Sequence, residues 1–294
     1  MKALVTGGYG YIGGHLVTSL MKRGWEVTIL DSMFNARDWT FFKTAKDNQL
    51  SVLNASVVNE DAVARAMQGV NVVYHLAARM DWQTNTNHVL RLYNVNTYGT
   101  AMVLAAARNA GVDTVVFASS AAVYGNVVDA AEDGPTDPVN IYGSSKLAAE
   151  GICRGFCNLG MNVIALRFFN VWGGKYSVSV VNRFVDGVKE LYGDGFQTRD
   201  FIHVDDVVTT LLSASRWEPM IYNIGTGAEI SIAGLWTKIN GDEEPVFKAR
   251  WAGQDEIQRS CANMEATYRR VAWRPKVVLA DLTKEEIVAL CRED

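Results

Sequence analysis

Short apolar runs rich in β-branched residues alternate with helical patterns through the first half of this chain. Such alternation is typical of a parallel sheet whose strands are joined by crossover helices. The predicted strands are 3–6, 25–30, 50–53, 70–76, 114–118 and 162–166, and the predicted helices are 11–23, 60–67, 89–109 and 144–158. The sequence therefore predicts an α/β fold built on a doubly wound parallel sheet, the Rossmann layout.

The rhythm changes after Asn170, where 181–191 is predicted as a helix that leads into a glycine-rich turn at 193–195. Segments 201–204 and 220–224 are predicted as strands, with a helix between them, that return to the large domain. We therefore expect a large domain over 1–170, to which 201–227 returns, and a second, smaller α/β substrate lobe mainly over 171–294.

The charge composition of the chain limits the kinds of molecule that it is expected to bind. The net charge of −4 and the pI near 5.7 leave no broad basic field, which argues against nucleic acid and anionic membranes. No apolar run reaches the ~18 residues that cross a bilayer. Residues 1–6 run straight into glycines without the layout of a signal peptide, so we expect a cytoplasmic protein with thiols rather than disulfides. Cys153 and Cys157 lack a second pair of ligands at matching spacing, so no metal site is predicted.

A glycine-rich segment, Gly-Gly-Tyr-Gly-Tyr-Ile-Gly over 7–13, joins the first predicted strand to the first predicted helix. Gly8, Gly10 and Gly13 match the pattern G-x-G-x-x-G. Glycines let the backbone approach a pyrophosphate, whose charge is met by free N–H groups at the helix N-terminus. A plain glycine turn is the alternative, but the strand and helix around the motif favour a dinucleotide site.

Asp31 ends the second predicted strand, where a carboxylate accepts hydrogen bonds from the adenosine ribose and repels a 2′-phosphate. The cofactor is therefore predicted to be NAD rather than NADP. Arg37 lies close in sequence, and an arginine there favours NADP. A solvated arginine on the surface is the more common interpretation of such a residue.

A second pattern, Y-x-x-x-K, is formed by Tyr142 and Lys146 after the fifth predicted strand, which ends near Ser119 and Ser120. Residues at i and i+4 share one face of a helix. An adjacent ammonium makes a phenolate easier to form, so Tyr142 can exchange a proton with a hydroxyl group of a substrate. The pattern alone occurs by chance on many helices, and its weight comes from its context.

Across nearly its whole length the chain resembles the extended short-chain dehydrogenase/reductase family, and within it the NAD-dependent 4-epimerases of UDP-glucose and UDP-N-acetylglucosamine. The resemblance is carried by seven ordered motifs, at 6–13, 75–78, 96–100, 119–125, 142–146, 167–173 and 193–207.

The resemblance implies a role for individual residues. It implies a catalytic set of Ser120, Tyr142 and Lys146. It implies NAD-binding residues at Gly7, Gly10, Tyr11, Ile12, Gly13, Asp31, Ser56, Val57, Leu76, Ala77, Ala78, Tyr142, Lys146 and Phe168. It implies substrate-binding residues at Ser120, Tyr142, Asn170, Arg199 and Arg250, with a UDP-hexose as the expected substrate. It also implies a homodimer formed through the helices near 95–109 and 144–158.

The chain departs from the family's pattern at three places. Ser56-Val57 stands where the family usually has Asp followed by an aliphatic residue, segment 79–88 is unlike that of common epimerases, and linker 173–175 is short. The last two segments line the sugar pocket in this family, so the resemblance leaves the hexose open.

Three functions stay open, with 4-epimerisation first. A 4,6-dehydratase or a UDP-glucuronate decarboxylase uses the same first oxidation but carries acidic residues after the catalytic serine, where this chain has Ala121 and Ala122. Asp81 or Glu132 is an alternative source of a carboxylate. A non-catalytic NAD-binding sensor is the third possibility, and the intact catalytic set argues against it.

Overall fold

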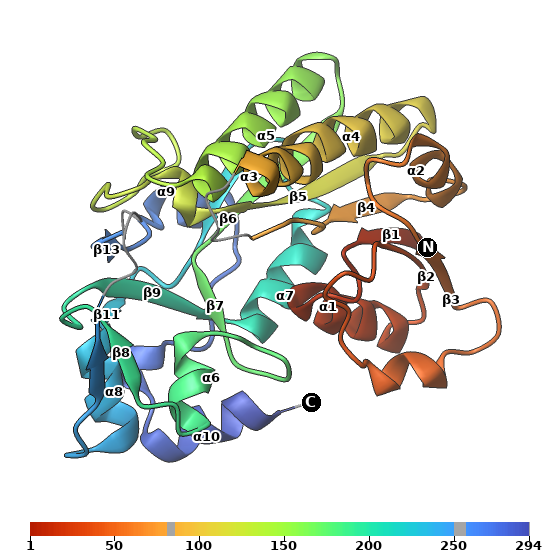
Figure 1. Cartoon of the computed structure of the whole chain (residues 1–294). Coiled ribbons are helices and arrows are strands. Elements are labelled where there is room, and N and C mark those ends of the chain that lie inside the picture. Colours follow the sequence, from red (N-terminus) through yellow and green to blue (C-terminus); the bar gives the residue numbers. More distant parts are fainter. Residues whose placement is uncertain (81–85, 250–256, 294) are drawn as a thin grey trace. The chain divides into compact units, whose positions relative to one another are not determined.

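The computed structural model describes residues 1–80, 86–249 and 257–293 (Figure 1). Its largest sheet has seven strands in the order β10-β6-β5-β4-β1-β2-β3. These strands are β1 (Lys2–Thr6), β2 (Glu26–Asp31), β3 (Leu50–Asn54), β4 (Val72–His75), β5 (Thr114–Ser120), β6 (Asn162–Phe168) and β10 (Ile221–Ile224). The strand order reverses beside β1, which confirms the predicted doubly wound fold.

Helices cover the sheet on both faces, with α2, α4 and α5 over one face and α1 over the other (Figure 1). They are α1 (Tyr11–Lys22), α2 (Glu60–Ala66), α3 (Thr86–Tyr93), α4 (Gly99–Asn109), α5 (Ile141–Asn158) and α7 (Val204–Ala214). The helix predicted over 89–109 is interrupted, because Asn94–Tyr98 forms a π-helical turn between α3 and α4.

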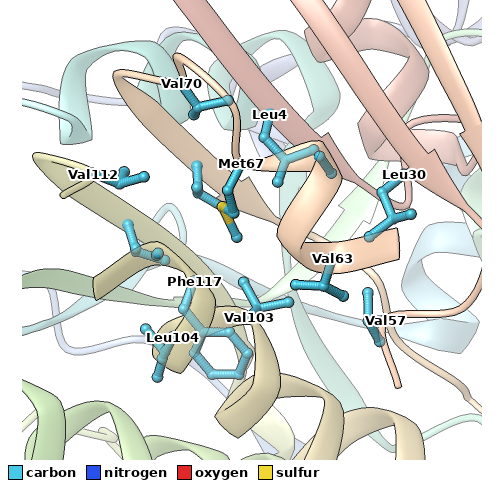
Figure 2. Packing of buried hydrophobic residues seen from close by; sticks show 14 of the residues in the cluster. Leu4, Leu30, Val57, Val63, Met67, Val70, Val103, Leu104, Val112 and Phe117 are labelled. Carbon is cyan, nitrogen blue, oxygen red and sulfur yellow. The ribbon is translucent and has the colours of Figure 1, made fainter. Parts of the chain in front are cut away.

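Two compact units make up the chain. Unit 1 comprises Met1–Ser119, Ser144–Leu166 and Val208–Tyr222, and unit 2 comprises Ser120–Gly143, Arg167–Val207 and Asn223–Asp294. The core of unit 1 is formed by apolar side chains of the sheet and of α2, α4 and α5 (Figure 2). Leu4, Val73 and Val115 are fully buried neighbours in parallel register on β1, β4 and β5. Each such side chain contributes about 1.5–3 kcal/mol of hydrophobic stabilisation, which holds this register.

The described residues of unit 2 form two small sheets and four α-helices that lie wholly within it. The sheets comprise β7 (Asn170–Trp172), β9 (Thr198–His203), β11 (Glu229–Ser231) and β13 (Arg259–Ser260), and the pair β8 (Glu190–Tyr192) with β12 (Val246–Lys248). The helices are α6 (Val180–Val185), α8 (Ile232–Asn240), α9 (Glu265–Arg270) and α10 (Lys284–Arg292). Its core contains Trp172, Phe184, Leu235, Trp236 and Ile287.

Two sequence expectations differ from the structure in this region. The helix predicted over 181–191 is wrong beyond Val185, because Gly187 takes a positive φ of 83° and the chain continues into β8. Segment 201–203 lies in the sheet of β7, β11 and β13, so the chain rejoins the seven-stranded sheet only at β10. Strand propensity alone does not say which sheet a strand joins, since pairing partners are distant in sequence.

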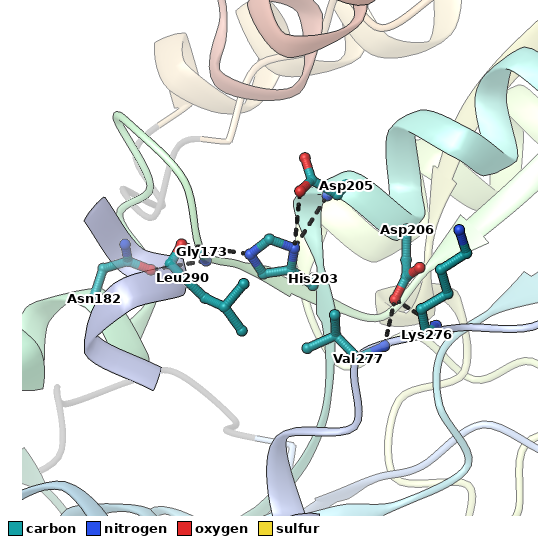
Figure 3. A network of polar contacts seen from close by, with 8 residues as sticks. All are labelled: Gly173, Asn182, His203, Asp205, Asp206, Lys276, Val277 and Leu290. Carbon is teal, nitrogen blue, oxygen red and sulfur yellow. Dashed lines mark hydrogen bonds and ion pairs between the residues drawn. The ribbon is translucent and has the colours of Figure 1, made fainter. Parts of the chain in front are cut away.

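A buried histidine fixes the end of α10 against the loop after β7 (Figure 3). The amide of Asp205 donates to Nδ1 of His203 at 3.3 Å, so Nε2 carries the proton and faces the Leu290 carbonyl at 3.5 Å. Asn182 accepts from the amide of Gly173 at 3.0 Å. Gly173 has a φ of 84°, and a Cβ there lies 2.1 Å from Nε2 of His203. Only glycine fits this position.

We therefore predict that Gly173→Ala lowers the free energy of unfolding by more than about 1 kcal/mol, because it adds a clash to an unfavourable backbone conformation. The loss is measured as a lower midpoint temperature of thermal unfolding. Gly187→Ala is the matched control, since Gly187 has nearly the same φ, 83°, and nothing within 4 Å of its Cβ position. Equal losses for the two variants would contradict the importance of the His203 contact.

Candidate active site

The glycine-rich loop is packed so closely at Gly7 and Gly13 that no side chain fits at these two positions. A Cβ on Gly13 lies 2.1 Å from the Gly7 carbonyl oxygen, and a Cβ on Gly7 lies 2.8 Å from the Ala77 nitrogen. Gly10 caps α1 without a side-chain hydrogen bond, and the first turn, which contains the amides of 11–13, carries no acidic residue. The loop thus offers backbone donors and a helix N-terminus to an anion, as the pyrophosphate of a dinucleotide requires.

Asp31, at the end of β2, is held in a fixed orientation by the main chain. Its Oδ2 accepts from the Tyr9 amide at 3.0 Å, and its Oδ1 accepts from the Met33 amide at 2.8 Å. Each oxygen keeps acceptor capacity for a ribose hydroxyl. Two ribose hydroxyls suit this carboxylate, whereas a 2′-phosphate is repelled by it.

The unusual Ser56-Val57 pair takes two different positions. Val57 is buried and packs on α4, where a Cβ on Gly99 lies 2.6 Å from Cγ2 of Val57. The Ser56 hydroxyl accepts from the Val58 amide at 3.4 Å. The predicted contact of these residues with an adenine ring stays a prediction.

A buried histidine connects the ends of β1 and β4 to α4. The Thr100 hydroxyl donates to the Asn96 carbonyl at 2.6 Å, so it accepts from Nε2–H of His75 at 3.0 Å. Nδ1 of His75 then accepts from the Thr6 hydroxyl at 2.7 Å, and that hydroxyl accepts from the Ala77 amide at 3.2 Å. Burial, followed by the charge of Lys146, lowers the pKa of His75 to about 3, so the ring is neutral.

The loop after β4, which contains Leu76, Ala77 and Ala78, is therefore fixed by polar contacts that the sequence argument did not assign. Asn96 accepts from the Arg79 amide at 2.8 Å and donates to the Arg79 carbonyl at 3.0 Å and to the Ser145 hydroxyl at 3.0 Å. In the sequence, these contacts were indicated only by Thr6 and His75, polar residues at the ends of two otherwise apolar strands.

The catalytic candidates stand at the end of β5 and the start of α5. Ser120 ends β5, its hydroxyl accepts from the Ala122 amide at 3.1 Å, and it hydrogen-bonds the Tyr142 side chain. Burial raises the pKa of Tyr142 to about 12, and the hydrogen bond from Ser120 opposes that rise. Burial thus dominates this pKa, and the opposing effect comes from Ser120 rather than from Lys146, from which the sequence predicted it.

Lys146 lies one helical turn after Tyr142 on α5 and is 2% exposed. Its Nζ donates to the Ala118 carbonyl at 2.8 Å and lies 4.9 Å from the centre of the Phe117 ring. Burial lowers the pKa of Lys146 to about 8, while the charges of nearby acidic groups raise it. The pKa of Lys146 is thus well below that of an exposed lysine but still above neutral pH.

The substrate candidates Asn170 and Arg199 lie on adjacent strands of unit 2, since Asn170 on β7 is in register with Phe201 on β9. Asn170 donates to the Asp200 carbonyl at 3.1 Å, and Arg199 donates to the Thr198 carbonyl at 2.8 Å. Phe168 is buried at the end of β6, and Arg250 lies outside the described residues.

Asp200, which the sequence argument passed over, fixes β9 between its neighbours. Its buried carboxylate accepts from the Thr226 amide at 2.9 Å, the Gly227 amide at 2.9 Å and the Ala262 amide at 3.2 Å. Burial raises its pKa, and these hydrogen bonds oppose the rise. The strand that carries Arg199 is therefore held rigidly, which suits a residue that binds a phosphate in one orientation.

The two positions after Ser120 carry only methyl groups, because they are Ala121 and Ala122. These two residues begin a 3₁₀ turn. Glu132, one alternative carboxylate, accepts from the Thr267 hydroxyl at 2.6 Å and from the Asn223 amide at 3.2 Å. Both bonds are to Oε1, so the carboxylate lies in the interior of unit 2, where Oε2 is buried without a hydrogen-bond partner among the described residues. Asp81 lies outside the described residues. Within 1–80, 86–249 and 257–293, no group of three or more His, Cys, Asp or Glu is arranged to hold a metal ion.

Comparison with known proteins places the chain in one enzyme family. The model of the NAD dependent epimerase/dehydratase family matches residues 3–225. A putative UDP-glucose 4-epimerase of Methanocaldococcus jannaschii is 30% identical over 302 residues, covering 97% of this chain and 96% of that protein. A UDP-N-acetyl-alpha-D-glucosaminuronate decarboxylase of Bacillus cytotoxicus is 32% identical over 250 residues, covering 79% of this chain and 77% of the relative.

Among solved structures, the UDP-glucose 4-epimerase of Thermotoga maritima with UDP-glucose superposes with a TM-score of 0.85 at 27% identity, covering 99% of this chain and 97% of that one. No helix in the described part of the chain is long and apolar enough to cross a membrane.

Proposed function

Since the chain belongs to the NAD-dependent epimerase/dehydratase family, we propose that it interconverts the two C4 epimers of a UDP-hexose. One observation carries this choice within the family. Ser120, Tyr142 and Lys146 are all present, and the positions after Ser120 are alanines. The residues for oxidation at C4 are kept, and those for elimination are missing from their usual place. NAD is the cofactor that the family's description names, in agreement with Asp31.

The residues of this chain account for the proton transfers. Tyr142 removes the proton of the sugar 4-hydroxyl, and Ser120 hydrogen-bonds the same oxygen and holds it in position. When bound, NAD supplies a reversible hydride acceptor for C4 of the sugar. Tyr142 later returns the proton to the oxygen at C4 of the epimer. Burial raises the pKa of Tyr142 to about 12, and the hydrogen bond with Ser120 opposes that rise. The family's pattern assigns to the positive charge of Lys146, one helical turn away, the role of favouring the phenolate.

The lyase alternatives need further groups. Elimination from C5 and C6 requires a base at C5 and a proton donor to the leaving hydroxyl. Methyl groups at Ala121 and Ala122 supply neither, and the Glu132 carboxylate already accepts hydrogen bonds from Thr267 and Asn223. The similarity to a decarboxylase keeps this class as the second candidate.

The remaining assignments follow from the same family pattern. Unit 1 carries the glycine loop and Asp31 and is assigned to the cofactor, while unit 2 carries Asn170 and Arg199 and is assigned to the nucleotide sugar. The guanidinium of Arg199 binds oxygens of the substrate diphosphate. Arg250 is the second candidate for that diphosphate.

Tyr142→Phe is expected to reduce turnover at least about 100-fold, because it removes the acid/base hydroxyl while the ring keeps its packing. The decisive comparison is between turnover and the amount of NAD bound by the purified variant, which we expect to be unchanged. A variant with near-wild-type turnover would contradict the assignment of the base.

Incubation with UDP-glucose and with UDP-N-acetylglucosamine, followed by NMR of the products, tests the type of reaction. We expect the galacto epimer of at least one of them. Accumulation of a 4-keto-6-deoxy sugar, or release of carbon dioxide from UDP-glucuronate, would instead place the chain among the lyases.

A homodimer formed through α4 and α5 is also proposed. Small residues on these helices, among them Ala105, Ala106 and Ala148, permit close helix approach. Light scattering at micromolar concentration should give twice the mass of 32.4 kDa, and a monomer would count against the proposal. The cytoplasmic location stays a prediction.

A further inference from the structure

A second buried charge lies on the catalytic helix, one turn beyond Lys146. Glu150 is only 3% exposed, and Lys146 is 2% exposed. An unpaired buried carboxylate costs several kcal/mol, so such a residue needs partners. One partner is Ser119, also 3% exposed, whose hydroxyl donates to Oε1 of Glu150 at 2.5 Å.

The two charged residues contact consecutive residues of one strand. Lys146 donates to the carbonyl of Ala118, and Glu150 accepts from the side chain of Ser119. The next residue along β5 is Ser120. The spacing i, i+4, i+8 puts Tyr142, Lys146 and Glu150 along one face of α5. The geometry thus places a buried carboxyl group in contact with the end of the strand and one helical turn from the lysine that the reaction uses.

From this arrangement we infer that Glu150 is a positioning residue for the reaction: its carboxylate keeps the Lys146 ammonium charged and, through Ser119, holds the end of β5 that presents Ser120. The inference rests on the roles proposed above for Lys146 and Ser120.

The other titratable groups that act on Lys146 do not replace this charge. His75 on β4 is neutral, because burial and Lys146 lower its pKa to about 3. Cys153 on α5 stays a neutral thiol near pH 7, because burial strongly raises its pKa. Burial lowers the pKa of Lys146 to about 8, and Cys153, followed by Glu150, opposes that shift. Because Cys153 is a neutral thiol near pH 7, Glu150 is the group that supplies the opposing charge. Removing the carboxylate therefore lowers the pKa of Lys146 further and reduces the fraction of ammonium at neutral pH.

The first test is the pH dependence of kcat/KM for Glu150→Gln. Loss of the anion should move the basic limb of the profile to lower pH by about one unit, because Lys146 deprotonates earlier. Glu150→Asp keeps the charge and should keep the limb in its wild-type position even if turnover falls. A Glu150→Gln profile that superimposes on the wild-type profile after scaling would overturn the inference.

Glu132→Gln is a matched control, since it makes the same substitution at another buried carboxylate, which bonds Thr267 and Asn223 in unit 2. It should lower the unfolding temperature and leave the basic limb in place. An equal shift of the limb in this control would mean that the shift reports general destabilisation, and would overturn the inference.

A double-mutant cycle tests the coupling without an activity measurement. Glu150→Gln should lower the Tm of the wild-type chain, but should leave unchanged or raise the Tm of Lys146→Met, where the carboxylate has lost its cation. If Glu150→Gln alone does not fold, the comparison within the Lys146→Met background decides. Equal losses in both backgrounds would overturn the inference. A chain without epimerase activity would refute the proposed function while this cycle still measures the coupling.

Discussion

The positions of the candidate cofactor-binding and catalytic residues depend on one constraint, the parallel register of β1, β4 and β5. Thr6 pairs with His75 and His75 pairs with Phe117, so β1 and β4 end at the same level and β5 continues beyond them to Ser120. The glycine loop, the loop after β4 and the serines after Ala118 are consequently delivered to one edge of the sheet. Apolar side chains on both faces hold this register, because a slip by one residue would exchange the buried sets.

Polar groups at that edge are buried together and satisfy one another. His75 bridges two threonines in a single tautomer, and one of these threonines also accepts from the Ala77 amide. The loop that packs on Gly7 is thereby fixed from two sides. A buried polar network of this kind specifies one geometry, because each broken contact leaves an unpaired group in a medium of low dielectric.

The charges on α5 explain why a buried lysine is usable here. A buried ammonium loses hydration, which favours the neutral amine, and a buried carboxylate loses hydration in the same way. One turn away on α5, the charge of Glu150 opposes the burial that lowers the pKa of Lys146. Glu132 shows the contrasting case, in which a buried carboxylate is bound by a threonine hydroxyl and a main-chain amide and serves the interior of unit 2.

The sequence by itself determined the strand–glycine–helix unit, the carboxylate that ends β2 and the spacing of Tyr142 and Lys146, because each is a local pattern written in consecutive residues. It predicted all seven strands of the large sheet, six in the first half of the chain and the seventh at 220–224, but it extended α6 too far and did not detect the π-helical turn before α4. Only the tertiary structure decided which polar groups meet. Ser119 and Glu150 are 31 residues apart, and Glu132 and Thr267 are 135 apart. Contacts over such separations depend on strand order and packing, and a single sequence does not record which distant residues they bring together.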